Sequence, residues 1–304
     1  MKKILSLVLT GIFVFGGALP TFASEKITDN NTQNQVGYSV YSEEFPDAYI
    51  VTSISGNNKS KNADSTIDLG TVTATVYVEE DYGFVDGKTI VTDSRLLSKD
   101  EVEAIGEDNF DDLNSESSTP DKNSRASNSR GKLTISLSGT TNTSGNGVIC
   151  NIGGLAKWDG FNFIVSPENN PAVGSDYCGF AWSGGFSASN STASATLDNG
   201  GVQKVYLSES TPNSGRVWEF NEYSAINSYK NYVKLANFGT KLSKSKLEGN
   251  GNKAEAVMKY IHTYQSTTGS ISISASSSGI GSGFSLSNTS KQWSISATLT
   301  GIPY

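Results

Sequence analysis

The single histidine, His262, is the side chain in this sequence with the most obvious catalytic potential. A serine hydrolase triad would have to use it as the general base, because the sequence offers no other imidazole. No G-x-S-x-G nucleophile elbow accompanies it, however, and it lies in Lys259–Tyr264, a segment typical of an ordinary strand or helix face. We therefore interpret His262 as an ordinary polar position on a strand or helix face rather than a catalytic residue.

A cysteine nucleophile is the second possibility, since both cysteines precede His262 in the chain. The segment Tyr177–Phe180, which contains Cys178, resembles the segment around the nucleophile of cell-wall cysteine peptidases. Such enzymes place the thiolate at a helix N-terminus, which lowers the pKa of the thiol. Here Cys178 precedes Ser183-Gly184-Gly185, which are poor helix formers, so the sequence argues against this chemistry.

Carboxylates and metal ligands give no clear site either. A glycosidase would need two acids on either side of a bond, and no spacing selects one pair. The candidates after residue 157 are Asp159, Glu168, Asp176, Glu219 and Glu222. One histidine and two cysteines cannot form a zinc tetrad without carboxylates, and the acidic run 107–112 lacks the glycine and the final glutamate of an EF-hand loop. We predict neither a metal site nor a cofactor.

Aromatic side chains in the second half of the chain are candidates for a binding platform. Tryptophan and phenylalanine fill cores as well as interfaces, and we consider the core the more frequent place for them. The candidate binding residues are Trp158, Phe161, Trp182 and Trp218.

The last part of the chain alternates serine with apolar residues, in 270–275 and again in 293–299. A membrane-inserting hairpin would need about 9–11 residues of such alternation in each strand. Ile271, Ile273 and Ala275 provide only three consecutive apolar positions before Ser276-Ser277-Ser278. The pattern therefore favours a terminal β-meander with a hydroxyl-rich face in water.

The N-terminus predicts export. Lys2 and Lys3 precede an apolar run, and small residues near Ala23 suit a signal peptidase, so we expect residues 1–23 to be removed and the mature chain to be secreted. We expect no transmembrane segment in the mature chain, because the apolar run is too short to span a bilayer. In an exported protein two cysteines indicate a disulfide, and we predict a Cys150–Cys178 bridge.

Charge divides the mature chain into an acidic and a mildly basic part. Residues 24–130 carry 21 acidic and 9 basic side chains, and residues 131–304 carry 9 and 12. We expect an acidic region at 24–113, disordered over 24–46, then a Ser/Asn-rich linker at 114–131 and a domain at 132–304. The acidic region is a possible pro-segment, with Arg125 and Arg130 as candidate processing sites. The low positive charge of the second part argues against nucleic-acid binding.

Periodicity predicts a mainly β fold. Residues 71–78 and 132–137 alternate apolar and hydroxyl side chains, which is the period of a half-buried strand. A capping box at Ser98 and Glu101 predicts a short helix ending at Gly106, and residues 219–238 suit helix and strand equally. We expect a C-terminal antiparallel β-sandwich, or a barrel-like domain, after a small acidic, partly disordered α+β region.

These observations rank three kinds of function. An extracellular, non-enzymatic protein that binds a partner, such as a cell-surface glycan or protein, comes first. A β-type pore-forming protein activated by proteolytic loss of the acidic region comes second. An exported hydrolase comes third, and it predicts a free, alkylatable Cys178 thiol.

Overall fold

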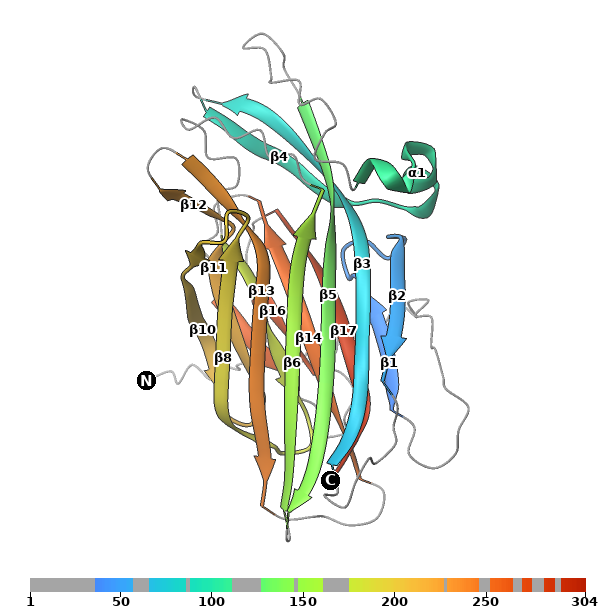
Figure 1. The fold of residues 1–304 in the computed structure, drawn as a ribbon, viewed down its shortest axis with the longest axis vertical. Helices are drawn as coiled ribbons and strands as arrows, with labels where there is room; N and C mark the ends of the chain where they lie inside the picture. The colour runs from blue at the N-terminus through green and yellow to red at the C-terminus, as the bar shows by residue number, and fades with distance from the viewer. Residues whose placement is uncertain are drawn as a thin grey trace, which may run out of the picture.

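Two antiparallel β-sheets packed face to face account for most of the molecule (Figure 1). The computed structural model describes residues 36–56, 66–85, 88–110, 127–144, 147–160, 175–226, 229–245, 252–264, 270–274, 282–287 and 291–304. The arrangement confirms the predicted mainly β, sandwich-like fold class.

The smaller of the two packed sheets has six strands. Their order is β1 (Gly37–Tyr41), β17 (Gln292–Pro303), β14 (Lys253–Thr263), β7 (Ser175–Trp182), β11 (Gly215–Asn221) and β10 (Val205–Thr211). Strands from both ends of the chain thus lie side by side, because β1 pairs with β17 from Gly37↔Thr300 to Tyr41↔Ser296.

The larger sheet has nine strands, several of them long. Its main path is β2 (Ile50–Ser55), β3 (Thr66–Val85), β5 (Ser127–Ser144), β6 (Gly147–Asp159), β13 (Tyr229–Lys244), β8 (Ser187–Leu197) and β9 (Val202–Gln203). Two further strands pair with this path, β4 (Lys88–Leu96) with β3 and β12 (Tyr223–Ile226) with β13. Strands β3 and β4 extend beyond the rest of the sandwich, beside the helix α1 (Figure 1).

The predicted alternation in the larger sheet is confirmed. Leu133, Ile135 and Leu137 of β5 are buried, whereas the hydroxyl side chains between them lie on the outer face. There Ser136 lies 2.9 Å from the Thr73 hydroxyl of β3, and Thr134 pairs with Thr75 at the same distance. Burial of one face and hydrogen bonding across the other together fix the register of β3 on β5.

The predicted helix is also confirmed. α1 (Lys99–Ile105) begins after Ser98, whose hydroxyl accepts a hydrogen bond from the Glu101 amide, while the Glu101 carboxylate accepts one from the Ser98 amide. A short 3-10 helix, η1 (Glu107–Phe110), follows. Both orphaned amide groups at the helix N-terminus are thus satisfied, as a capping box requires.

Two expectations on secondary structure differ from the structure. Residues 37–41 were expected to be disordered, but they form β1, because its backbone completes the edge of the six-stranded sheet beside β17. The ambiguous segment 219–238 is strand wherever it is described, in β11, β12 and β13. The strand expected at 161–165 lies outside the described residues.

The predicted disulfide is wrong, because both cysteines are free. Cys150 lies on β6 in the larger sheet and Cys178 on β7 in the smaller sheet, and both are fully buried. Burial raises the pKa of the Cys150 thiol to about 12 and that of Cys178 well above its ordinary value. The two side chains therefore contribute to the core as small apolar groups.

The end of the chain differs from the predicted meander. β15 (Ser270–Ser274) and β16 (Gly283–Ser287) pair with each other in a separate two-stranded sheet. β17 instead lies between β1 and β14, and its Ser294 and Ser296 side chains are buried. No helix in the described part of the chain is long and apolar enough to cross a membrane.

Candidate functional site

The β15–β16 pair, called the hairpin below, is attached to the sandwich at one place. β14 ends at Thr263 and β17 begins at Gln292, and these two residues are paired, so both connections to the hairpin leave from the same end of neighbouring strands. We call residues 262–264 and 291–293 the root of the hairpin. The candidate site consists of the hairpin and the polar groups that hold its root.

The hairpin is amphipathic. Its serines are exposed and hydrogen-bond across the two strands, with 2.8 Å between the hydroxyls of Ser270 and Ser287 and 3.0 Å between those of Ser272 and Ser285. Its apolar residues face the six-stranded sheet and pack on an apolar patch of that sheet. The hairpin residues are Ile271, Ile273, Phe284 and Leu286, and the patch is Tyr177, Val217 and Ile261.

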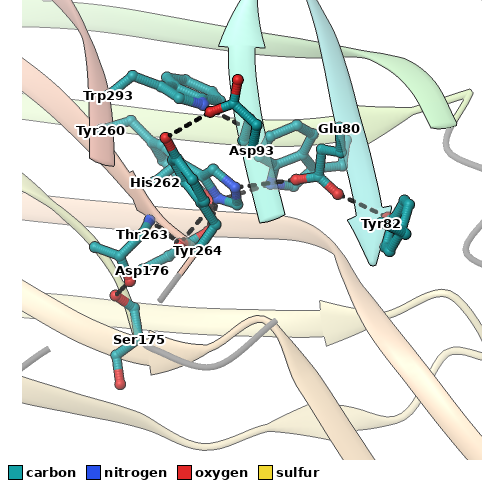
Figure 2. Close-up of polar contacts among 12 residues, drawn as sticks. Glu80, Tyr82, Asp93, Ser175, Asp176, Tyr260, His262, Thr263, Tyr264 and Trp293 are labelled. Atoms are coloured by element: carbon teal, nitrogen blue, oxygen red, sulfur yellow. Dashed lines mark hydrogen bonds and ion pairs between the residues drawn. The ribbon is translucent and has the colours of Figure 1, made fainter. Parts of the chain in front are cut away.

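His262, the first residue of the root, lies between two carboxylates (Figure 2). Its Nε2 is 3.0 Å from Glu80 Oε1 of β3, and its Nδ1 is 3.2 Å from Asp176 Oδ1 of β7. All three side chains are buried, with His262 and Asp176 at 0% exposure. The imidazole therefore links the two sheets of the sandwich, because His262 and Asp176 belong to the six-stranded sheet and Glu80 belongs to the nine-stranded sheet.

The surroundings of His262 favour the charged form of its imidazole. Burial alone would lower its pKa, but the carboxylates of Asp176 and Glu222 and the hydrogen bonds to Asp176 and Glu80 raise the pKa well above the ordinary value. Only the charged form can donate from both nitrogens at once. This protonation state thus satisfies both carboxylates that face it.

Glu222, at the end of β11, is the third carboxylic acid of this group. Burial and the nearby charge of Asp176 raise its pKa well above the ordinary value, and the neighbouring His262 opposes that rise. Its Oε2 has no hydrogen-bond partner among the residues that the structure describes. His262 and Glu222 therefore both bind a proton more tightly in the closed site than in water.

A chain of hydrogen bonds extends from this ion pair into both sheets. The Trp158 indole donates to the Tyr260 hydroxyl at 3.0 Å, and Tyr260 in turn donates to Asp176. On the other side the Tyr82 hydroxyl donates to Glu80 Oε2 at 2.7 Å. A network with this many satisfied members fixes one arrangement of the strands that contribute to it.

Further bonds hold the root itself (Figure 2). The Thr263 amide donates to Asp176 Oδ1 at 3.1 Å, and the Tyr264 hydroxyl donates to Asp93 at 3.2 Å. On the returning strand the Trp293 indole donates to Ser94 at 2.9 Å, and the Lys291 ammonium donates to a backbone carbonyl of β4 at 2.7 Å. Strands β3 and β4 thus hold the root from one side and β7 from the other.

Asp176, Glu222 and His262 could hold a metal ion, since their ligand atoms lie within 4.8 Å of one another. Both imidazole nitrogens, however, already face carboxylate oxygens at hydrogen-bond distance. A doubly protonated imidazole has no lone pair with which to bind a cation. We therefore interpret the group as a hydrogen-bonded ion pair.

The aromatic candidates lie inside the protein where they are described. Trp158, Trp182 and Trp218 are 2%, 1% and 5% exposed, and Phe161 lies outside the described residues. Their rings face the interior because they fill the space between the sheets, so a binding platform on them does not fit this placement.

The processing candidates fall on different parts of the chain. Ala23 and Arg125 lie outside the described residues. Arg130 lies in β5, and its Nε is 2.6 Å from Glu79 Oε2 of β3.

The acids considered as catalytic pairs also separate. Asp159 pairs with Lys157 at 2.6 Å, and Glu219 accepts a hydrogen bond from Ser208 at 3.3 Å. Glu168 lies outside the described residues, whereas Asp176 and Glu222 meet at His262. His262 lies on a strand, one of the two placements expected, but its side chain is fully buried.

The sequence contains a signal for this buried cluster. In 71–78 the inward residues are even-numbered, and the same period places Glu80 on the inward face after Val76 and Val78. The same period places His262 after Met258 and Tyr260, all three of which are buried. A charged residue in an apolar register indicates a paired, buried group.

The sequence matches no protein-family model and no curated protein. Solved structures show remote similarity. A pore forming protein is 9% identical, with 91% of this chain and 96% of that chain covered and a TM-score of 0.23. The T6 backbone pilin of Streptococcus pyogenes is 10% identical over 77% of this chain and 64% of that chain, with a TM-score of 0.25. The collagen adhesin of S. aureus is 10% identical over 82% and 93%, with a TM-score of 0.22. TM-scores this low carry no argument about function, which must come from the site itself.

Proposed function

We propose that this protein permeabilises membranes from outside the cell, and that the hairpin is the segment that enters the bilayer. The observation that carries the proposal is the hairpin's construction as a separate amphipathic two-stranded sheet. It packs on the sandwich through side chains, and it lies on no backbone hydrogen-bonding path of either large sheet. Its apolar face can exchange protein for lipid while β15 and β16 stay paired.

Such an exchange costs the apolar face of the hairpin little. Burying an aliphatic or aromatic side chain stabilises by about 1.5–3 kcal/mol, and a hydrocarbon core provides the same burial as the sandwich. The exposed serines would face the water-filled interior of a barrel, as polar residues do in transmembrane β-strands. A lone hairpin leaves unsatisfied backbone groups in lipid, so several copies must close a barrel.

The length of the segment is sufficient. Between Tyr264 and Lys291 the chain has 26 residues, or 13 for each arm of a hairpin. A transmembrane strand needs about 9–11 residues.

The proposal keeps the N-terminal strands in the active protein. β1 pairs with β17, and β3 pairs with β5 from Thr66↔Asn142 to Tyr82↔Ser127. Loss of residues 24–113 would strip strands from both large sheets and would remove Glu80 from His262. Secretion through a signal peptide at 1–23 is part of the proposal.

A matched pair of substitutions tests the function. Ile273→Lys places a charge on the face that would contact lipid, and Ser272→Lys places the same charge on the opposite, exposed face. A lysine facing the bilayer centre costs about 2–4 kcal/mol in each strand. We expect dye release from liposomes to be lost with Ile273→Lys and retained with Ser272→Lys. Equal release by the two variants, or none from the unmodified protein under any condition, would refute the proposal.

A second candidate is binding to a partner at the cell surface. Val202, Tyr206 and Leu207 are 80%, 51% and 52% exposed on β9 and β10, which follow each other in the chain, and the Lys204 ammonium lies 4.4 Å from the centre of the Tyr206 ring. Large apolar side chains exposed to solvent are candidates for contact with a partner. Binding to glycans or cells that falls after Val202→Ser and Leu207→Ser, with no dye release from liposomes, would favour this function instead.

A further inference from the structure

The buried Glu80–His262–Asp176 link occupies the place where the hairpin leaves the sandwich. Thr263 and Tyr264 follow His262 directly and are themselves bonded to Asp176 and Asp93. The hairpin cannot swing away from the six-stranded sheet at its root while these contacts persist.

We propose that the Glu80–His262–Asp176 link is a proton-dependent latch, which holds the hairpin on the sandwich while the imidazole is charged and frees its root when the imidazole loses its proton. The inference rests on the proposed function and adds its regulation. It predicts that the trigger is a rise in pH rather than a fall.

The latch follows from the hydrogen-bonding capacity of histidine. A charged imidazole donates to Glu80 at 3.0 Å and to Asp176 at 3.2 Å. A neutral imidazole has one N–H, so one of the two carboxylates would face a nitrogen lone pair. A buried carboxylate without a donor is strongly unfavourable, and the strand end that carries His262 must then move.

Several other titratable groups surround the imidazole, and each contributing element supplies at least one. They are Glu80 and Tyr82 from β3, Asp93 from β4 through Tyr264, Asp176 from β7, Glu222 after β11, and Tyr260 from β14 itself. Burial together with Asp93 raises the pKa of Tyr264 to about 12. The raised pKa values keep Tyr260 and Tyr264 neutral over the range in which an ordinary histidine titrates.

The direction of the pH dependence follows from the proton count. The pKa values of His262 and Glu222 are both raised in the closed site, so both groups bind protons more tightly there than in water. Once the root opens to water, histidine loses its proton above about pH 6.5 and glutamate above about pH 4.3. Opening therefore releases protons, and higher pH favours it.

The expected slope is steep. One proton released on opening makes the opening constant rise about tenfold per pH unit, and two protons make it rise up to about a hundredfold. The opening constant begins to rise near pH 6.5, where a water-exposed histidine loses its proton. It stops rising at the pH where His262 loses its proton in the closed site as well. Glu222→Gln removes one titrating group, so the opening constant of this variant should rise only about tenfold per pH unit.

Hydrogen exchange in the full-length secreted protein tests the latch without any membrane. Protection factors for peptides covering 262–274 and 283–293 are measured between pH 6 and 9, each against the unfolded chain at the same pH. We expect these factors to fall at least about tenfold per pH unit in the unmodified protein. Constant protection across this range would overturn the latch.

Substitutions assign the effect to His262. His262→Gln cannot be charged, so its root should be less protected than that of the unmodified protein at pH 6. Its protection factors should also fall less steeply with pH, by about tenfold per unit. Glu44→Gln is the matched control, because exposed Glu44 also bonds to the root region, at Ser294, but lies outside the link. A control slope as shallow as that of His262→Gln would overturn the assignment. If His262→Gln does not fold, Glu80→Gln serves in its place. Without the Glu80 carboxylate the closed site should lose its imidazole proton at a lower pH, so the opening constant should stop rising at a lower pH than in the unmodified protein.

Dye release measured on the same samples separates the two proposals. Root opening that depends on pH, with no release from liposomes, supports the latch and refutes the proposed function. Release without any change in root protection supports the proposed function and refutes the latch.

Discussion

Replacing Asp176 with alanine should destabilise the protein more than any single substitution at the surface. Asp176 accepts hydrogen bonds from His262, Tyr260 and the Thr263 amide, and it is 0% exposed. Its loss leaves a buried imidazolium with one acid instead of two and leaves two further donors without an acceptor. Removing one partner of a buried ion pair costs roughly 3–5 kcal/mol.

Urea unfolding at pH 7, followed by tryptophan fluorescence, measures this loss, because all four tryptophans are buried. Glu44→Ala provides the comparison. Its carboxylate accepts two hydrogen bonds from Ser294, but the residue is exposed, so the loss should be about 1 kcal/mol. Should Asp176→Ala cost no more than Glu44→Ala, the cluster would not be the buried ion pair described above. If Asp176→Ala yields no folded protein, Asp176→Asn takes its place. Its loss of unfolding free energy should be smaller than that expected for Asp176→Ala but still larger than that of Glu44→Ala.

Three further predictions concern the rest of the molecule. The free energy of unfolding should fall as pH rises above about 6.5, because a group whose folded pKa is raised stabilises fully below its unfolded pKa and loses that contribution above it. One such group can contribute at most about 1.4 kcal/mol per pH unit, and a stability that rises from pH 6.5 to 8 would contradict this sign. Cys150 and Cys178 should resist a thiol reagent in the folded protein and react with two equivalents in denaturant, and a mass two units lower in the unreduced protein would indicate a disulfide instead. Ser98→Ala should lower stability by about 1 kcal/mol in the same urea assay, with Ser98→Asp close to the unmodified protein, and equal losses in both would argue against the capping role.

Local patterns in the sequence predict the strands and the helix well. Alternation in 132–137 predicts β5 because one face is apolar and the other can hydrogen-bond to the neighbouring strand. The capping box at Ser98 predicts α1 because all of its partners lie within four residues. The β1 strand was missed, since its stability comes from β17, more than 250 residues away.

The site is harder to predict, because it is assembled from distant parts of the chain. Glu80 and His262 are 182 residues apart in sequence, so no spacing rule connects them. The even count of two cysteines suggested a bridge, but Cys150 and Cys178 belong to different sheets. What the sequence does offer is register, because Glu80 and His262 both continue an inward-facing series, and two opposite charges in buried registers are candidates for a pair.

The apolar face of the hairpin was also difficult to predict from the sequence. Its three alternating apolar positions were judged too few for a membrane segment, and a sheet face in water was preferred. The structure places the opposite arm, with Phe284 and Leu286, beside Ile271 and Ile273, which doubles the apolar face. Only the pairing of the two arms reveals this surface.

The most direct test of the central claim is the environment of the hairpin in the presence of membranes. A fluorescent label is attached at Ser285→Cys or at Leu286→Cys, neighbours on opposite faces of β16, while the two native cysteines stay buried. On liposomes the label at 286 should be quenched by nitroxide lipids and the label at 285 by aqueous iodide. If neither label is quenched by the nitroxide lipids, the hairpin does not enter the bilayer and the account is contradicted.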